Sequence, residues 1–140
     1  MDTVSKSQRS YNMSRIRSKN TKPEIVVRQK LYNQGLRYRL HVKHLSGRPD
    51  IVIKKYKLII EIRGCFWHGH RDCKYYSSPK TNSSYWSEKI SRNKKRDKEN
   101  GERLIKEGFK VFIIWECETK KIEVLNSKVE EIVSYKETLM

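Results

Sequence analysis

Long apolar runs and a secretion signal are both missing from this chain. No apolar stretch approaches the roughly 20 residues that a membrane-spanning helix needs. The start, Met1-Asp2-Thr3, is not followed by an apolar signal segment. Only three cysteines are present, an odd number that does not suit a disulfide framework. We therefore expect a cytoplasmic protein with no membrane partner, in which cysteine beside histidine serves metal binding or catalysis.

Acidic residues are scarce as well. The 140 residues contain 16 Asp and Glu against 32 Lys and Arg, which gives a net charge of +16. This excess predicts a polyanionic partner, with nucleic acid ahead of an anionic membrane surface. A merely cationic protein is the simpler alternative. The length suits a single domain, which we place at residues 21–140, after a basic N-terminal arm at residues 1–20.

Local signals predict the elements of that domain. Thr21 is a helix N-cap, Pro23 lies in the first turn, and Glu24 completes a capping box. The apolar patterning predicts helices at residues 21–35, 84–108 and 120–138, and strands at 36–42, 49–53, 57–63 and 109–115. The order αβββαβα predicts an α/β fold in which a mixed sheet is flanked by helices.

Cysteine and histidine gather directly after the third predicted strand. Cys65, His70 and Cys73 have the spacing C-x4-H-x2-C, and Cys117 follows the last predicted strand. Thiolates and imidazole are the ligands that zinc prefers, and four of them close a tetrahedral structural site. His68 would be a fifth ligand, too close to Cys65, so we leave it out of the set. The alternative is three unrelated buried cysteines and a surface histidine.

Carboxylates mark the two strands of the predicted hairpin. Asp50 begins the first strand, and Glu61 and Arg63 point to one side at the end of the second. Two carboxylates with a backbone carbonyl between them predict an oxygen-rich Mg²⁺ site, and the adjacent cation suits a phosphate. The pattern P-D-x10-E-x-R is one conservative step from the PD-(D/E)xK signature of metal-dependent nucleases. Acidic residues that merely end strands are the alternative, and Glu24 either caps its helix or adds an acid to the site.

Five blocks of the sequence together resemble the very-short-patch-repair (Vsr) DNA mismatch endonucleases. They lie within roughly residues 8–118 and read 11-YNMSRIRSKNTKPE-24, 47-GRPDIVI-53, 64-GCFWHGH-70, 86-WSEKISRNKKRD-97 and 115-WECE-118. The family nicks DNA on the 5′ side of the T in a T·G mismatch. The resemblance therefore implies a PD-(D/E)xK nuclease-like (restriction-endonuclease-like) fold with a structural zinc site, in a bacterial protein that is associated with the nucleoid when bound to DNA.

The resemblance also implies roles for individual residues. Asp50 is the principal Mg²⁺ ligand beside the carbonyl of Ile62, His68 is the catalytic histidine, and Glu24 is the helix-borne acid near the metal. The structural zinc ligands are Cys65, His70, Cys73 and Cys117. The residues that wedge into the DNA stack at the mismatch are Phe66 and Trp67 from one groove and Met13 from the other.

The sequence departs from the family at two places. Arg71 and Asp72 separate His70 from Cys73, at a loop whose length varies among family members, so His70 is a less secure zinc ligand than Cys65 or Cys117. The family members also lack an acid at the position of Glu61. That residue therefore either adds a metal ligand here or pairs with Arg63 and has no catalytic role.

Basic residues cover much of the long predicted helix. Lys89, Arg92 and Arg96 are candidate phosphate contacts, and a solvated basic face is the alternative. Asn93 and Asp97 interrupt the apolar stripe of this helix, so we expect them to hydrogen-bond to the sheet or to groups around the active site. His41 and His44 show no pattern, and we assign them to a strand and a loop.

These observations predict a Mg²⁺-dependent, zinc-stabilised endonuclease that nicks T·G-mismatched duplex DNA. We expect a monomer, because a lesion on one strand requires no two-fold symmetry, and mismatch-repair proteins are candidate partners. One alternative is a restriction-type nuclease that cuts matched DNA. Another is a zinc-stabilised DNA-binding module without turnover.

Overall fold

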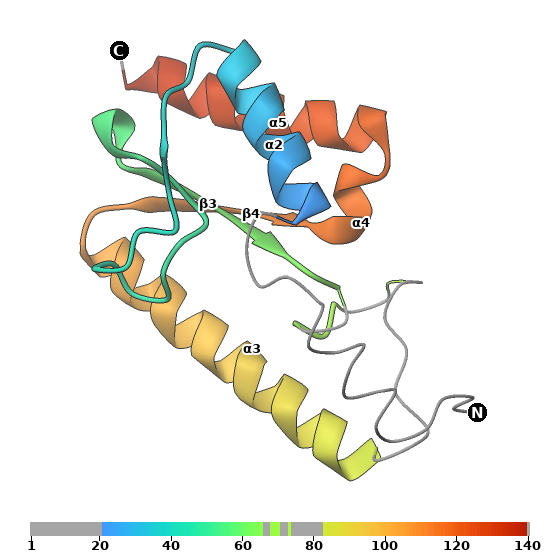
Figure 1. The fold of residues 1–140 in the computed structure, drawn as a ribbon. Coiled ribbons are helices and arrows are strands. Elements are labelled where there is room, and N and C mark those ends of the chain that lie inside the picture. The colour runs from blue at the N-terminus through green and yellow to red at the C-terminus, as the bar shows by residue number, and fades with distance from the viewer. Residues whose placement is uncertain (1–20, 66–67, 71–72, 74–82, 140) are drawn as a thin grey trace.

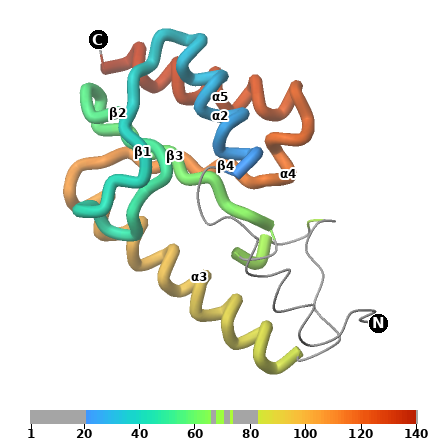
Figure 2. The backbone as a smooth tube through the Cα atoms, viewed as in Figure 1, coloured from blue at the N-terminus to red at the C-terminus, as the bar shows by residue number. Residues whose placement is uncertain are grey.

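The computed structural model describes residues 21–65, 68–70, 73 and 83–139. Within them, four strands form one mixed sheet in the order β1-β2-β3-β4 (Figure 2). The strands are β1 (Arg39–Leu40), β2 (Ile51–Ile53), β3 (Leu58–Arg63) and β4 (Lys110–Trp115). The first three are antiparallel neighbours, whereas β3 and β4 are parallel. The predicted α/β architecture with a mixed sheet is confirmed.

Helices cover both faces of this sheet. Helices α2 (Lys22–Asn33) and α5 (Ile122–Thr138) lie on one face, and α3 (Ser83–Lys106) crosses the other (Figure 1). Two short elements were not predicted from the sequence, the 3-10 turn η1 (Lys54–Tyr56) and helix α4 (Glu116–Thr119). None of the described helices is both long and apolar enough to cross a bilayer.

Strand alternation divides the apolar core into two layers. Ile51, Ile53, Leu58 and Ile60 pack toward α2 and α5 and belong to the larger cluster. The intervening residues Val52 and Ile59 face the opposite side, where they pack with Leu104 of α3. This period of two is the pattern expected of a sheet that is covered on both faces.

The first predicted strand, residues 36–42, is wrong in its length. Only Arg39 and Leu40 form β1, and the strand ends at Leu40 because His41 adopts a left-handed backbone with φ of 47°. A residue other than glycine rarely occupies this region, and extended backbone cannot continue through it. The predicted hairpin between β2 and β3 is confirmed by their antiparallel pairing.

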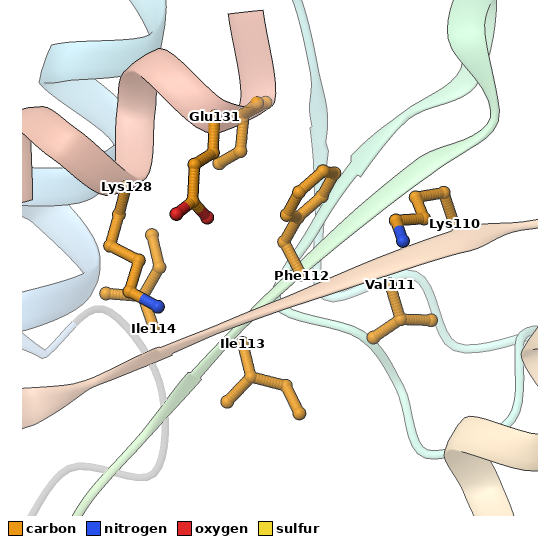
Figure 3. Close-up of a pocket in the computed structure, with 8 residues that line it drawn as sticks. Lys110, Val111, Phe112, Ile113, Ile114, Lys128 and Glu131 are labelled. Atoms are coloured by element: carbon orange, nitrogen blue, oxygen red, sulfur yellow. The ribbon is translucent and has the colours of Figure 1, made fainter. Parts of the chain in front are cut away.

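Strand β4 forms one edge of the described sheet. Residues Lys110 to Ile114 line a groove of about 260 Å³ together with Lys128 and Glu131 of α5 (Figure 3). None of the residues that line this groove belongs to the predicted site. The described members of the predicted metal and catalytic sites instead gather around the C-terminal end of β3 and the segments next to it.

Candidate active site and metal centres

The parallel register of β3 and β4 positions the cysteine cluster. Arg63 pairs with Trp115, so Cys65 and Cys117, each two residues further along, arrive at the same end of the sheet. The ligand atoms of four residues all lie within 4.8 Å of one another: Cys65, His70, Cys73 and Cys117. These are the four zinc ligands predicted from the sequence, and His68 lies outside the group.

The donor set of this cluster fits a zinc ion. Burial is the largest cause that raises the pKa of the Cys65 thiol, to about 12, and burial also raises the pKa of Cys117. Thiolates at these positions therefore need a compensating cation. Three thiolates and one imidazole form a common structural zinc set, so these residues could hold Zn²⁺.

Contacts around the cluster hold His70 in place. Its backbone N–H donates to the Cys65 carbonyl over 2.9 Å, and its Nδ1 lies 3.5 Å from the sulfur of Cys117. The imidazole ring stacks on the indole of Trp115, with ring centroids 4.0 Å apart and an interplanar angle of 5°. In the sequence, Trp115 was noted only within the segment 115-WECE-118 that resembles the family. Its stacking on His70 could not be predicted, because it depends on the fold.

A second cluster forms around Asp50, directly before β2. The Oδ2 atom of Asp50 accepts a hydrogen bond of 2.8 Å from the N–H of Ile62 in β3. Burial raises the pKa of the Asp50 carboxyl from 3.8 to about 6, against the opposing effect of this hydrogen bond. The negative charges of Glu24 and Glu61 raise the pKa further, whereas His41 lowers it. The site therefore resists a bare carboxylate and favours a bound cation.

Glu24 lies in the first turn of α2, and its carboxylate belongs to the group of ligand atoms around Asp50. Its backbone N–H donates to Oγ1 of Thr21, the N-cap of α2, over 3.5 Å. Its carboxylate is only 5% exposed and its Oε2 lies 3.0 Å from Nη2 of Arg28 and 3.1 Å from Nε2 of His41. The side chain therefore points into the Asp50 cluster while the backbone is capped.

His41 is the residue of this cluster that the sequence did not reveal. From the sequence, we assigned His41 to a strand, but the residue lies directly after β1, which ends at Leu40. The ligand atoms of Glu24, His41 and Asp50 all lie within 4.8 Å of one another. No local sequence pattern indicates that His41 joins this cluster, because the position of its ring depends on the left-handed backbone at that residue.

Glu61 and Arg63 form an ion pair. The Nη2 atom of Arg63 lies 2.9 Å from Oε2 of Glu61, and Glu61 is not part of the ligand cluster around Asp50. Arg63 also places its Nε atom 4.0 Å from Oδ2 of Asp97. This geometry favours the alternative in which Glu61 pairs with Arg63 over the one in which it adds a metal ligand.

His68 is held by a carboxylate from α3. Its Nδ1 atom lies 2.6 Å from Oδ2 of Asp97, and its backbone N–H donates to the carbonyl of Gly64 over 3.1 Å. Asp97 hydrogen-bonds, as expected, and its partner His68 is the histidine to which the family resemblance gives a catalytic role. The signal in the sequence was a carboxylate on an otherwise apolar helical stripe, although it did not identify His68 as the partner.

The predicted DNA-contacting residues are only partly within the described structure. Arg92 and Arg96 are exposed, one helical turn apart on α3. Lys89 is half-buried, and its Nζ lies 5.9 Å from the ring centroid of Trp86. The predicted wedge and arm lie outside the described residues: Met13, Phe66, Trp67 and residues 1–20.

Comparison with known proteins places the chain among relatives that match nearly all of its length. A family model described as DNA mismatch endonuclease Vsr matches residues 1–75. The Type II nicking enzyme V.NmeAIP of Neisseria meningitidis is 46% identical over 132 residues, covering 94% of this chain and 94% of that protein. The Type II nicking enzyme V.XorIIP of Xanthomonas oryzae is 42% identical, covering 94% of this chain and 96% of its own.

The DNA mismatch endonuclease Vsr of Escherichia coli is 38% identical over 135 residues, covering 93% of this chain and 86% of that protein. The family match and these relatives agree with the resemblance of the sequence blocks. The chain therefore belongs to the Vsr family of DNA mismatch endonucleases.

Proposed function

We propose that the protein is an endonuclease that nicks duplex DNA on the 5′ side of the T in a T·G mismatch, by cation-dependent hydrolysis. The observation that carries the proposal is the arrangement next to β3 of a carboxylate–histidine cluster that could hold a cation and a histidine–carboxylate pair, in a member of this family. Relatives named as nicking enzymes and as a DNA mismatch endonuclease support the same reaction.

The residues around Asp50 fit a divalent cation. Asp50, the carbonyl of Ile62 and the buried carboxylate of Glu24 would hold Mg²⁺, as the family resemblance implies. The raised pKa of Asp50 shows that its negative charge is poorly solvated, and a cation offsets that cost. A cation held there would supply stabilisation of negative charge on the scissile phosphate and on the departing 3′ oxygen.

His68 acts as the general base in this proposal. A carboxylate can only accept hydrogen bonds, so the 2.6 Å contact assigns a proton to Nδ1 of His68, which donates to Asp97. The other ring nitrogen, Nε2, is then free to take a proton from the attacking water. Asp97 fixes the ring orientation and stabilises the imidazolium that forms. The products are a 5′-phosphate and a 3′-hydroxyl at a nick.

The zinc set and the basic helix serve DNA binding in the proposed function. Insertion of Phe66 and Trp67 replaces base–base stacking by base–ring stacking, worth about 1–3 kcal/mol per base. The neighbouring ligand Cys65 would hold this segment rigid without a hydrophobic core beneath it. A T·G wobble pair is weakly stacked, so opening it costs less than opening a matched pair. Arg92 and Arg96 would bind phosphates along the duplex.

A nicking assay that compares two duplexes, identical except for a T·G or a T·A pair at one position, tests the proposal. We expect nicking of a T·G duplex that rises with Mg²⁺ concentration, and no comparable nicking of the T·A duplex. Asp50→Asn should abolish nicking while DNA binding persists. Equal nicking of both duplexes would indicate a restriction-type nuclease. Binding without nicking in any divalent cation would indicate a DNA-binding module.

A further inference from the structure

His41 is positioned by the backbone that carries Asp50. The N–H of His41 donates to the carbonyl of Asp50 over 3.1 Å, and the N–H of Val42 donates to the carbonyl of Pro49 over 3.3 Å. These bonds continue the pairing of β1 with β2 by two residues, although His41 has left the extended conformation. This backbone pairing keeps His41 next to Asp50, and the imidazole lies within 4.8 Å of the Asp50 carboxylate.

We propose that Glu24, His41 and Asp50 form a mixed oxygen and nitrogen site that binds Mn²⁺ more tightly than Mg²⁺. The inference rests on the proposed function, since Asp50 is also the ligand of the reaction's cation. Mg²⁺ is a hard ion that prefers oxygen ligands and retains several waters. Imidazole nitrogen suits first-row transition cations, whereas carboxylate oxygen suits Mg²⁺ and Mn²⁺ alike. His41 therefore determines which ion the site prefers.

The distances in the cluster suit a common ion. Two adjacent ligands of an octahedral ion, each about 2.1 Å from it, are separated by about 3 Å. Oε2 of Glu24 and Nε2 of His41 are 3.1 Å apart, which matches such a pair. The third ligand atom, on Asp50, lies within 4.8 Å of both. A small side-chain rotation would complete the site.

The surroundings of the three ligands also suit a bound cation. Oε2 of Glu24 accepts a hydrogen bond of 3.0 Å from Arg28, and Oδ2 of Asp50 accepts one of 2.8 Å from Ile62. Hydrogen bonds of this kind orient ligand carboxylates and are a regular part of metal sites. The Glu24 side chain is 5% exposed and the His41 side chain 22% exposed, so the ring lies on the solvent side of the pair.

A simpler role for His41 is to neutralise Glu24 as a protonated partner in an ion pair. In that case the ring would stabilise the fold and would make no difference to the choice of cation. The two roles differ in a measurable quantity, the ratio of Mn²⁺ to Mg²⁺ affinity in the absence of DNA.

Mn²⁺ binding to the full-length, zinc-loaded chain tests the inference. Free Mn²⁺ is followed by electron paramagnetic resonance as the ion is titrated in, and Mg²⁺ is then added as a competitor. We expect His41→Gln to weaken Mn²⁺ binding about tenfold or more while Mg²⁺ affinity stays nearly unchanged. The amide of glutamine can still donate to Glu24. His44→Gln is the matched control, because His44 is exposed in the same loop, and it should bind Mn²⁺ as the wild type does.

Pulsed electron paramagnetic resonance on the wild type keeps the test decisive if His41→Gln is unstable, because nitrogen coupling to bound Mn²⁺ reports the imidazole directly. Absence of that coupling, or equal Mn²⁺ affinity in wild type and His41→Gln, would overturn the inference. Mn²⁺ binding that depends on His41, without nicking in any cation, would support the site and contradict the proposed function. Nicking with Mg²⁺ and no preference for Mn²⁺ would support the proposed function and contradict the inference about His41.

Discussion

The two ligand clusters are both built next to the end of β3, yet they differ in chemistry. One offers three sulfurs and an imidazole, and the other offers two carboxylates and an imidazole. Sulfur ligands hold a structural ion and contribute to folding. Carboxylate ligands keep a hard cation exchangeable and leave positions for water and phosphate. The difference teaches that the fold separates a sulfur-rich ligand set from an oxygen-rich one, so that each could hold a different kind of ion.

Strand β3 connects the two clusters. The N–H of Ile62 holds Asp50, and three residues later Cys65 begins the sulfur cluster. Between them, Arg63 contacts Glu61, lies 4.0 Å from Asp97, and has its guanidinium 5.9 Å from the ring centroid of Trp115. An ion bound by the sulfur cluster would therefore fix the end of β3, on which the position of Asp50 depends.

Loss of a sulfur ligand should have the largest effect. Cys117→Ser removes one of four zinc ligands and leaves the remaining thiols in an incomplete site, so we expect the free energy of unfolding to fall on the order of 4 kcal/mol. Chemical denaturation and bound zinc, measured by atomic absorption, check this. Asp50→Asn is the control and should retain one zinc per chain. Full zinc content and unchanged stability in Cys117→Ser would show that Cys117 is not a ligand of a structural ion.

The histidine–carboxylate pair should matter to the reaction and not to the zinc. Asp97→Asn removes the negative charge that stabilises the imidazolium of His68, so we expect the nicking rate constant to fall by about 100-fold. Single-turnover nicking of a T·G duplex measures it, and DNA affinity and zinc content should be unchanged. Glu102→Gln, an exposed carboxylate on the same helix, is the matched control. A nicking rate equal to that of the wild type would remove Asp97 from the mechanism.

Asp50 should destabilise the protein when no divalent cation is added. Its pKa is raised to about 6, so the folded state favours the protonated form, and this stabilising contribution is lost as pH rises from 3.8 through 6. We therefore expect Asp50→Asn to be more stable than wild type at pH 8 by roughly 2 kcal/mol, with no difference below pH 3.8. Thermal unfolding between these pH values checks the trend. A gap that does not change with pH would mean that burial does not penalise this carboxylate.

Much of both clusters could be predicted from the sequence, for physical reasons that differ. The sulfur cluster was predictable because cysteine is rare here and its ligand spacing is local, apart from Cys117. Asp50 was predictable from its position in the hairpin and from the family block that contains it. His41 was not, because its ring is placed by a left-handed residue after a two-residue strand. Neither was the pairing of His68 with Asp97, since it depends on how α3 packs against the sheet.

The smallest effect should come from a surface outside both clusters. Arg92→Ala combined with Arg96→Ala removes two exposed cations from α3, so we expect DNA binding to weaken on every sequence and the salt slope of binding to fall by about one per lost phosphate contact. Fluorescence anisotropy over a range of salt concentrations measures this slope. Lys54→Ala, an exposed lysine on η1, is the control and should bind DNA as the wild type does. These exposed arginines are members of neither ligand cluster in the described part of the chain. Zinc content and Mn²⁺ affinity should therefore stay constant, and a change in either would mean that the surface and the clusters are coupled through α3.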